Sequence, residues 1–359
     1  MLKTGLCETL GIQVPIIQAP MAGGVTTPEL VSEVCKAGAL GSFGFAYTQP
    51  ETMQRDAELV RERTKAPFNL NLFASKALGA IEDAEQRSAI DAVAPYFEEL
   101  GLKRPKPIRA PFAPDINAQL AAIESIRPAV FTFHLGEIEG TRLAHLRAQG
   151  IRIGGSATCI AEAKHLEALG ADFIVAQGTE AGGHRGTYMR DPYEAMTGTL
   201  ALVRLIVRAV RIPVVAAGGI MDGAGIAAAL ALGAEAAQLG TAFVTCRESG
   251  APLVHKAAIL GAADDDTLIT EKFSGKPARG IANRYMREMR DAPTLPFPAQ
   301  NTLTGPLRAA AAKAGSSDFP SLWSGQAAAL ARELPAAELV ATLRDETLAA
   351  LTRLSALRG

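Results

Sequence analysis

Short apolar runs alternate with helix-like stretches along most of the chain. The apolar runs are nearly continuous in Val, Ile and Phe, which is typical of parallel strands buried on both faces. Eight runs predict strands: Pro15–Gln18, Leu40–Phe45, Phe68–Phe73, Ala129–Leu135, Ile151–Ser156, Phe173–Gln177, Pro213–Ala217 and Ala236–Gly240. Such an alternation fits a (β/α)8 barrel at least as well as a doubly wound sheet. We therefore expect an α/β fold of the TIM-barrel type.

Cap residues delimit several of the expected helices. Thr27 and Pro28 supply an N-cap and a first helical residue before Glu29–Lys36, and Gly38 suits the C-terminal end of that helix. Comparable units occupy Thr158–Leu169 before Gly170, Thr199–Val210, and Gly223–Leu232 before Gly233.

Two segments are longer than a minimal barrel needs. Ala74–Ile126 separates the third and fourth strands and contains the Pro-rich stretch Arg104–Pro114. Thr245–Gly315 follows the eighth strand, and Ser321–Leu357 is again helical in pattern. We expect a barrel at residues 1–247, a smaller lid domain inserted after strand eight at residues 248–319, and closing helices of the barrel at residues 320–359.

Charge and composition exclude several classes of protein. The 359 residues include 36 Lys+Arg and 37 Asp+Glu, a balance that argues against nucleic-acid and membrane-surface partners. No stretch approaches the ~20 apolar residues of a membrane span, and the start lacks a signal-peptide pattern. Four scattered cysteines without a CxxC pair indicate neither a disulfide framework nor zinc. We expect a cytoplasmic protein whose oligomeric state the sequence leaves open.

Glycine turns end the last two expected strands, where TIM barrels often bind phosphate. Gly218 and Gly219 follow one strand, and Gly240 and Thr241 follow the next. Glycine lets the backbone approach an anion closely, and the N–H groups at a following helix N-terminus point at it. Neither GxGxxG after the first strand nor a P-loop motif is present, which argues against those nucleotide folds.

The sixth strand leads into Gln177-Gly178-Thr179-Glu180-Ala181-Gly182-Gly183-His184-Arg185-Gly186. His184 is suited to general acid–base work at the barrel mouth, and Arg185 could hold an anion. His134 ends the fourth strand, and the sequence favours a functional and a structural role for it equally. His145, His165 and His255 lie in helical stretches and are expected at the surface. No histidine spacing supports a metal site.

Earlier strand ends add two candidate ligand contacts. Met21, after the first strand, offers a thioether and nearby backbone N–H groups to a flat ring. Asn69 and Asn71 alternate onto the same side of the third strand, which is the barrel interior if either binds a ligand. Asn71 lies nearer the C-terminal end of the strand and is the better candidate, because a buried amide needs partners.

These motifs together resemble the nitronate monooxygenases, formerly called 2-nitropropane dioxygenases, and most closely the bacterial class I type. The resemblance is carried in order by QAPMAGG, NLN, QGTEAGGHRG, AAGGIMDG and QLGTAF, and by the expected helix start at Trp323–Ala327. It implies a TIM barrel that holds FMN and oxidises alkyl nitronates with O2 to a carbonyl compound and nitrite. His184 falls on the family's active-site histidine. The implied FMN contacts are Met21, Asn71, Gln177, Gly182, Gly219, Gln238, Gly240 and Thr241, with Gly218 added from the phosphate argument.

One part of the family pattern is missing. Class I members that prefer propionate 3-nitronate carry tyrosines and a lysine in the lid, whereas Leu295–Leu303 has none. The stretch around Pro111 and Phe112 also lacks a tyrosine. We therefore expect a more apolar substrate pocket, with His134, Arg185 or a lid arginine as the remaining polar contacts.

Two other functions remain open from the sequence. The same scaffold supports an NAD(P)H-dependent flavin reductase of a quinone or enoyl thioester, and the glycine turns do not discriminate between the two enzymes. A non-catalytic flavin- or phosphate-binding protein would leave the histidine on the flavin face without a purpose.

Overall fold

The computed structural model describes residues 2–358, and its centre is a sheet of eight parallel strands in the order β1-β9-β8-β6-β5-β4-β3-β2. A parallel bridge between Ile17 and Leu40 joins the first and last strands of that order, so the sheet closes into a barrel. The predicted TIM barrel is thus confirmed. The barrel strands are β1 (Ile16–Gln18), β2 (Gly41–Gly44), β3 (Phe68–Phe73), β4 (Val130–His134), β5 (Arg152–Ala157), β6 (Phe173–Gln177), β8 (Val214–Ala217) and β9 (Ala236–Leu239).

A short helix that the sequence analysis did not anticipate closes the N-terminal end of the barrel. Helix α1 (Gly5–Leu10) places Leu6 and Leu10 in one buried cluster with Ile17 and Phe173 from the strands. The Leu6 N–H donates to a carboxylate oxygen of Glu235 at 2.6 Å, which ties the helix to the start of β9. Helix α1 therefore covers the N-terminal end of the barrel, and the polar and glycine-rich ends of the strands line the opposite, C-terminal end.

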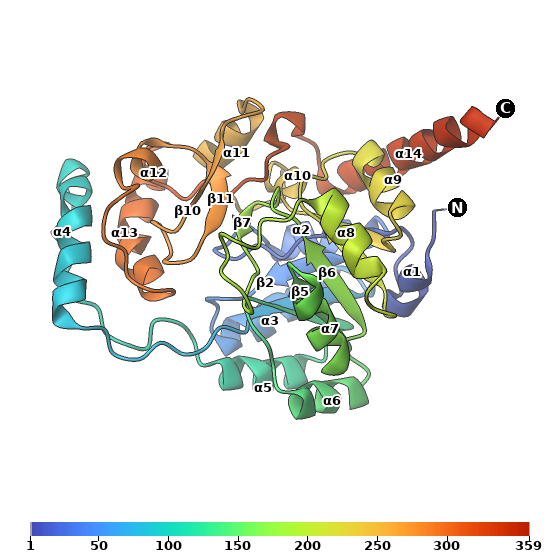
Figure 1. Ribbon diagram of the computed structural model, residues 1–359, viewed down its shortest axis with the longest axis horizontal. Helices are drawn as coiled ribbons and strands as arrows, with labels where there is room; N and C mark the ends of the chain where they lie inside the picture. Colours follow the sequence, from blue (N-terminus) through green and yellow to red (C-terminus); the bar gives the residue numbers. More distant parts are fainter. Residues whose placement is uncertain (1, 359) are drawn as a thin grey trace.

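The outer ring of helices follows the strands in chain order. Thr27 caps the first of them by accepting a hydrogen bond from the Leu30 N–H, as predicted. The last helix, α14, packs between α9 and α2 and completes the ring (Figure 1). The ring consists of α2 (Pro28–Lys36), α3 (Pro50–Arg63), α5 (Ile116–Ile126), α6 (Gly140–Ala148), α7 (Ile160–Ala168), α8 (Thr199–Val207), α9 (Gly223–Ala231) and α14 (Ala336–Ser355), which continues as the short helix η2 (Ala356–Arg358).

The prediction of a helix from Ser321 is wrong for the first fifteen residues. Helix α14 begins only at Ala336, after Pro335, and the preceding segment contains no more than the single turn η1 (Ala328–Leu330). Its backbone instead bonds to other elements: Trp323 bridges to Gly280, and the Gln326 N–H donates to the Glu180 carbonyl at 2.9 Å. These tertiary bonds replace the helical ones.

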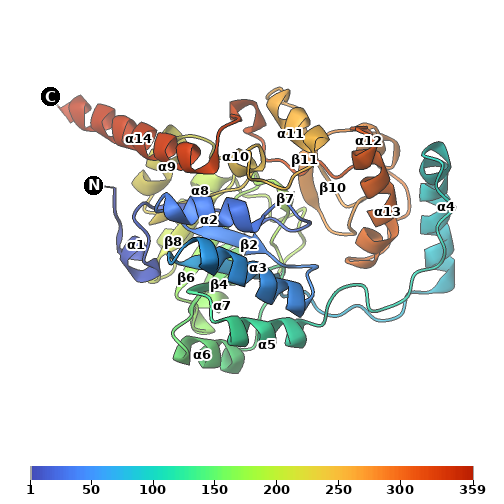
Figure 2. The same ribbon diagram turned by 180° about the vertical axis from the view of Figure 1, so that it is seen from behind.

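A second hydrophobic cluster lies beside the barrel mouth (Figures 1 and 2). It combines two distant parts of the sequence, because α4 packs against α13 and both contribute buried side chains. Two long connections lead from the barrel to α4 and back (Figure 2). The elements of this region are α4 (Asp83–Glu99), β10 (Thr267–Thr270), β11 (Ala278–Ile281), α12 (Arg284–Glu288) and α13 (Ala299–Lys313). Helix α10 (Thr241–Val244) packs into the barrel core, and α11 (Leu253–Leu260) belongs to a smaller cluster beside it.

A small sheet links the two regions. Strand β7 (Gly183–His184) leaves the loop after β6 and pairs antiparallel with β11, which in turn pairs with β10. His184 lies opposite Ala278 in this pairing. In the part of the chain described here, no helix combines the length and the apolar character needed to cross a bilayer.

Candidate functional site

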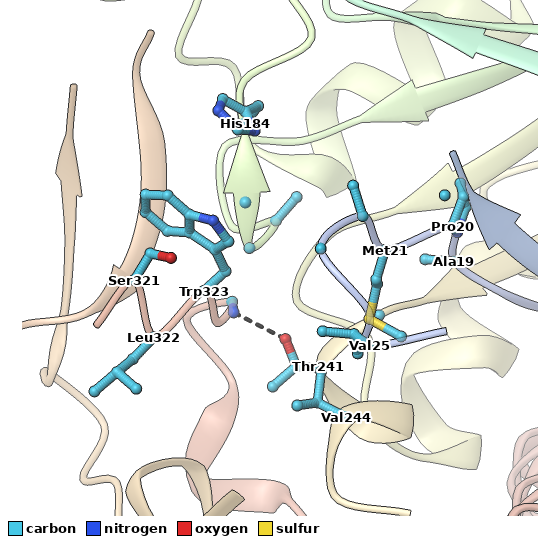
Figure 3. Close-up of a pocket in the computed structure, with 18 of the residues that line it drawn as sticks. Ala19, Pro20, Met21, Val25, His184, Thr241, Val244, Ser321, Leu322 and Trp323 are labelled. Atoms are coloured by element: carbon cyan, nitrogen blue, oxygen red, sulfur yellow. Dashed lines mark hydrogen bonds between the residues drawn. The ribbon is translucent and has the colours of Figure 1, made fainter. Parts of the chain in front are cut away.

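A cavity of about 430 Å³ opens at the C-terminal end of the barrel and extends beneath the second cluster. In Figure 3, His184 and Trp323 on one side and Met21 on the other surround it. Almost all of the residues proposed from the sequence line it: Met21, Asn71, His134, Gln177, Gly182, His184, Gly218, Gly219, Gln238, Gly240 and Thr241. Arg185 is the exception.

The two glycine turns present free backbone donors to the cavity. Gly218 and Gly219 have φ angles of 118° and 70°, which favour glycine, and a Cβ at Gly218 would lie 2.8 Å from the Thr199 hydroxyl. Within residues 2–358, the N–H groups of Gly219, Gly240 and Thr241 make no hydrogen bond with another backbone group. Unpaired N–H groups on the wall of one cavity suit an anion such as a phosphate.

The start of α9 does not contribute to this anion site, contrary to the expectation that a helix N-terminus would. Asp222 caps the helix by accepting from the Gly225 N–H at 2.8 Å. Glu346 from α14 accepts from the Gly223 N–H at 3.0 Å. Two carboxylates therefore already accept from the N–H groups of Gly223 and Gly225. The candidate anion site consists of the glycine turns that precede the helices.

Amide side chains face the cavity from the barrel strands. The Asn71 Nδ2 donates to the Thr132 hydroxyl at 2.9 Å, and Asn69 donates to the same oxygen, which confirms that both amides lie in the barrel interior. Gln238 lines the cavity from the end of β9. These amides, the Met21 thioether and the glycine turns fit a flat ring with polar edges that carries one phosphate.

An aromatic cage surrounds the imidazole of His184. Its ring centroid lies 5.6 Å from Phe73, 5.5 Å from Phe297 and 5.7 Å from Trp323. The Nε2 atom is 2.9 Å from the Ser274 Oγ, which is itself 3.1 Å from the Lys276 carbonyl. The single hydroxyl proton of Ser274 can go to His184 Nε2 or to the Lys276 carbonyl, so this contact fixes the orientation of the imidazole rather than its tautomer. Nδ1 is the nitrogen that faces away from Ser274.

The backbone of His184 is held by two side chains from the barrel. The His134 Nε2 donates to the His184 carbonyl at 3.1 Å, and the Gln177 Nε2 donates to it at 3.0 Å. The Gln177 Oε1 also accepts from the Gly186 N–H at 2.7 Å. His134 and Gln177 thus fix the loop that presents His184, in addition to lining the cavity.

Burial keeps both imidazoles neutral at physiological pH. It lowers the pKa of His184 to about 3, helped by the charges of His134, Lys276 and Arg308. Burial likewise lowers the pKa of His134 to about 4, which the hydrogen bond to the His184 carbonyl partly opposes. A cationic His184 is therefore not the resting state of the free site.

Arg185 does not line the cavity, unlike the other candidate residues. Its buried guanidinium donates to the backbone carbonyls of Ala195 and Gln177. The expectation that His255 lies at the surface is wrong: His255 is buried, lines the cavity and donates from Nε2 to the Trp323 carbonyl at 2.9 Å.

Two positioning residues escaped the sequence analysis. Ser274 gave no local signal, since it bonds to a residue 90 positions away. Glu162 is fully buried and accepts from the Thr158, Tyr188 and Met189 N–H groups at 2.7–3.1 Å, which anchors the chain that follows His184. A signal did exist, because Glu162 is the third residue of α7, where a glutamate often reaches back to the backbone before the helix.

The lowered pKa values predict a pH dependence that NMR can check. His184 and His134 should stay neutral in the folded protein down to pH about 4, whereas the unfolded chain protonates near 6.5. The unfolded state then binds more protons, so the free energy of unfolding should fall as the pH falls from 6.5 towards 4. Spectra of isotope-labelled histidine, assigned with His184→Asn, should show no His184 titration above pH 5; a midpoint near 6.5 would contradict the burial argument.

Comparisons with known proteins agree with this site. The profile of the family described as "Nitronate monooxygenase" matches residues 3–346. The nitronate monooxygenases of Paraburkholderia phytofirmans and Pseudomonas aeruginosa are each 46% identical to this chain, covering 96% and 94% of it and 95% and 97% of themselves. A crystal structure of nitroalkane oxidase from Streptomyces ansochromogenes superposes with a TM-score of 0.91 at 39% identity, covering 98% of this chain and 100% of that one. The chain belongs to the nitronate monooxygenase family of flavin-dependent oxidoreductases.

Proposed function

We propose that this protein uses FMN to oxidise alkyl nitronates with O2 to a carbonyl compound and nitrite. One observation carries the proposal. The neutral imidazole of His184 lines the same cavity as the free N–H groups of Gly219, Gly240 and Thr241. Membership of the family supports it.

The residues present fit FMN. The Gly219, Gly240 and Thr241 N–H groups would hold its phosphate, while Asn71, Gln238 and Met21 would border its ring. When bound, the flavin supplies the electron acceptor, and the protein supplies position and charge. Residues 248–319, together with α4, would act as the lid that keeps water from the ring and the substrate.

The charges around His184 favour an anionic substrate. Lys276 and Arg308 are the cations whose fields reach His184, and no carboxylate opposes them there. A bound nitronate would raise the pKa of His184, because a nearby anion favours the charged imidazole. His184 would then carry a proton on both nitrogens and donate a hydrogen bond to a nitronate oxygen. For a neutral nitroalkane, the neutral imidazole would accept the proton from carbon.

The flavin itself gives the first test. The purified protein should be yellow, and heating should release FMN rather than FAD, because the glycine turns make one phosphate site. Chromatography of the released flavin decides this. Recovery of FAD, or a colourless protein that does not take up FMN, would refute the cofactor assignment.

Turnover tests the reaction. A panel of alkyl nitronates should give O2 uptake and nitrite release together, without added NAD(P)H. Anaerobic mixing with NAD(P)H is the matched experiment, since a flavin reductase would bleach its flavin rapidly. Fast bleaching with no nitrite from any nitronate would replace this proposal by the reductase.

A substitution of the histidine tests its role. His184→Asn should keep bound FMN, because the phosphate contacts come from other strand ends, and should lower kcat/KM by roughly 10²–10⁴-fold. Turnover of a neutral nitroalkane should fall further than that of its preformed nitronate, since only the former needs a base. If the variant with full flavin occupancy oxidises nitronates at the normal rate, His184 has no role in the reaction.

A further inference from the structure

One loop residue, Glu180, contacts both halves of the candidate anion site without lining the main cavity. It lies between β6 and β7, four residues before His184. Its side chain reaches the turn of Gly218 and Gly219, and its backbone reaches the segment that bonds to Thr241. The free N–H groups of the site belong to these two strand ends, so Glu180 can influence the distance between them.

The carboxylate of Glu180 caps helix α8. The N-cap residue of that helix is Gly198, which has no side chain to accept from the first N–H groups. Both carboxylate oxygens of Glu180 instead lie 2.9 Å from the Thr199 backbone nitrogen, and Oε2 also lies 2.8 Å from the Thr199 hydroxyl. A negative charge at a helix N-terminus is stabilising. Glu180 therefore holds Thr199 at a fixed position relative to the loop that carries His184.

Glu180 and Thr199 pack together against the first glycine turn. The Thr199 Oγ1 is 3.0 Å from the Gly218 carbonyl oxygen, and a Cβ at Gly218 would lie 2.8 Å from that Oγ1. A Cβ at Gly219 would lie 3.1 Å from the Cβ of Glu180. The one hydroxyl proton of Thr199 can go to the carboxylate or to the Gly218 carbonyl, and in either case the three groups stay in contact. The two side chains thus support the turn from outside the main cavity.

The backbone of Glu180 reaches the second half of the site. The Gln326 N–H donates to the Glu180 carbonyl at 2.9 Å. The adjacent Gly325 N–H donates to the Thr241 hydroxyl at 2.9 Å, the dashed bond in Figure 3. Glu180 is therefore connected to Gly218 and Gly219 through its side chain and to Thr241 through its carbonyl.

A second cavity shows why the first turn needs this support. The cavity has a volume of about 320 Å³, lies between α8 and α9, and shares Gly218 and Gly219 with the main cavity. The turn is thus a wall between two cavities, and part of its outer face is not packed. Glu180 and Thr199 also line the second cavity, so they supply contacts exactly where the surrounding packing is incomplete.

We propose that Glu180 and Thr199 are positioning residues for the phosphate of the flavin, which hold the Gly219 N–H at the distance from Thr241 that a phosphate needs. The inference rests on the proposed function, because it takes FMN as the ligand. A carboxylate beside the turn repels an anion, so its benefit comes from geometry and not from charge. The two effects predict opposite results when the carboxylate is removed.

Two flavins separate a phosphate-specific effect from a general one, since riboflavin is FMN without the phosphate. Fluorescence titration of the full-length chain, freed of flavin, measures both dissociation constants. The native chain should bind FMN at least about 100-fold more tightly than riboflavin, and Glu180→Ala should lower this preference by roughly 10- to 100-fold through the Kd of FMN alone.

Three further variants complete the test. Thr199→Val removes the hydroxyl but keeps the N–H that Glu180 caps; it should lower the preference several-fold, and it carries the test if Glu180→Ala does not fold. Glu180→Gln keeps an oxygen acceptor for that N–H and should stay within about threefold of the native preference. The control is Asp115→Ala, which removes the capping carboxylate of another ring helix, α5, and should change neither Kd.

Three results would overturn the proposal. An equal rise of both dissociation constants in Glu180→Ala would show a general structural role, and tighter FMN binding by Glu180→Ala and Glu180→Gln would show that charge dominates. A native chain that binds FMN no better than riboflavin would exclude a phosphate site altogether. None of these measurements uses turnover. If FMN binds as described but no nitronate is oxidised, the proposed function fails and the positioning role stands.

Discussion

The pairing of β7 with β11 fixes the position of the one histidine on which the site depends. It places His184 opposite Ala278, at the junction of the barrel and the second cluster. The barrel holds the carbonyl of His184 through His134 and Gln177, while Ser274 from the other region holds its imidazole. A movement of either region would therefore change the direction of Nδ1. This arrangement explains how a residue in a glycine-rich loop can have a defined orientation.

The same junction determines the charge of the cavity. Phe73, Phe297 and Trp323 shield much of His184 from water, and this burial keeps the imidazole neutral. Lys276 and Arg308 supply positive charge without forming an ion pair across the cavity. A neutral imidazole in the field of two cations is a poor environment for a cationic ligand and a good one for an anion. The cavity thus favours an anion before any reaction takes place.

The barrel could be predicted from the sequence because each of its strands is marked by a local pattern of residues. Each is a short apolar run that ends in a turn, and all eight form where expected. The residues at the strand ends then fall on the cavity by topology alone, which is why Met21, Gln238 and the glycine turns were found. The sequence pattern could not show that Arg185 and His184 differ in role, because both lie in the same loop. The fold shows that the Arg185 guanidinium bonds to backbone carbonyls outside the cavity lining.

Contacts between distant residues could not be predicted in this way. Ser274 lies in a turn, and its partner His184 is 90 positions away along the chain. Arg308 lies on α13, and its partner Ser321 comes from outside that helix. Helical composition after Ser321 predicted a helix, but backbone bonds to Gly280 and Glu180 require an extended path there. His255 has a helical sequence context, yet its imidazole is drawn inward by the carbonyl of Trp323. In each case a tertiary hydrogen bond overrides the local preference.

A crystal structure of the holoprotein with a bound nitroalkane tests the central claim most directly, because it shows the nitro group, His184 and the flavin together. We expect the nitro group within hydrogen-bond distance of His184 Nδ1 and in contact with the flavin ring. Continuous density for His184 bonded to Ser274 would complete the agreement. A nitro group bound away from His184, or an imidazole whose Nδ1 rather than Nε2 faces Ser274, would contradict the account.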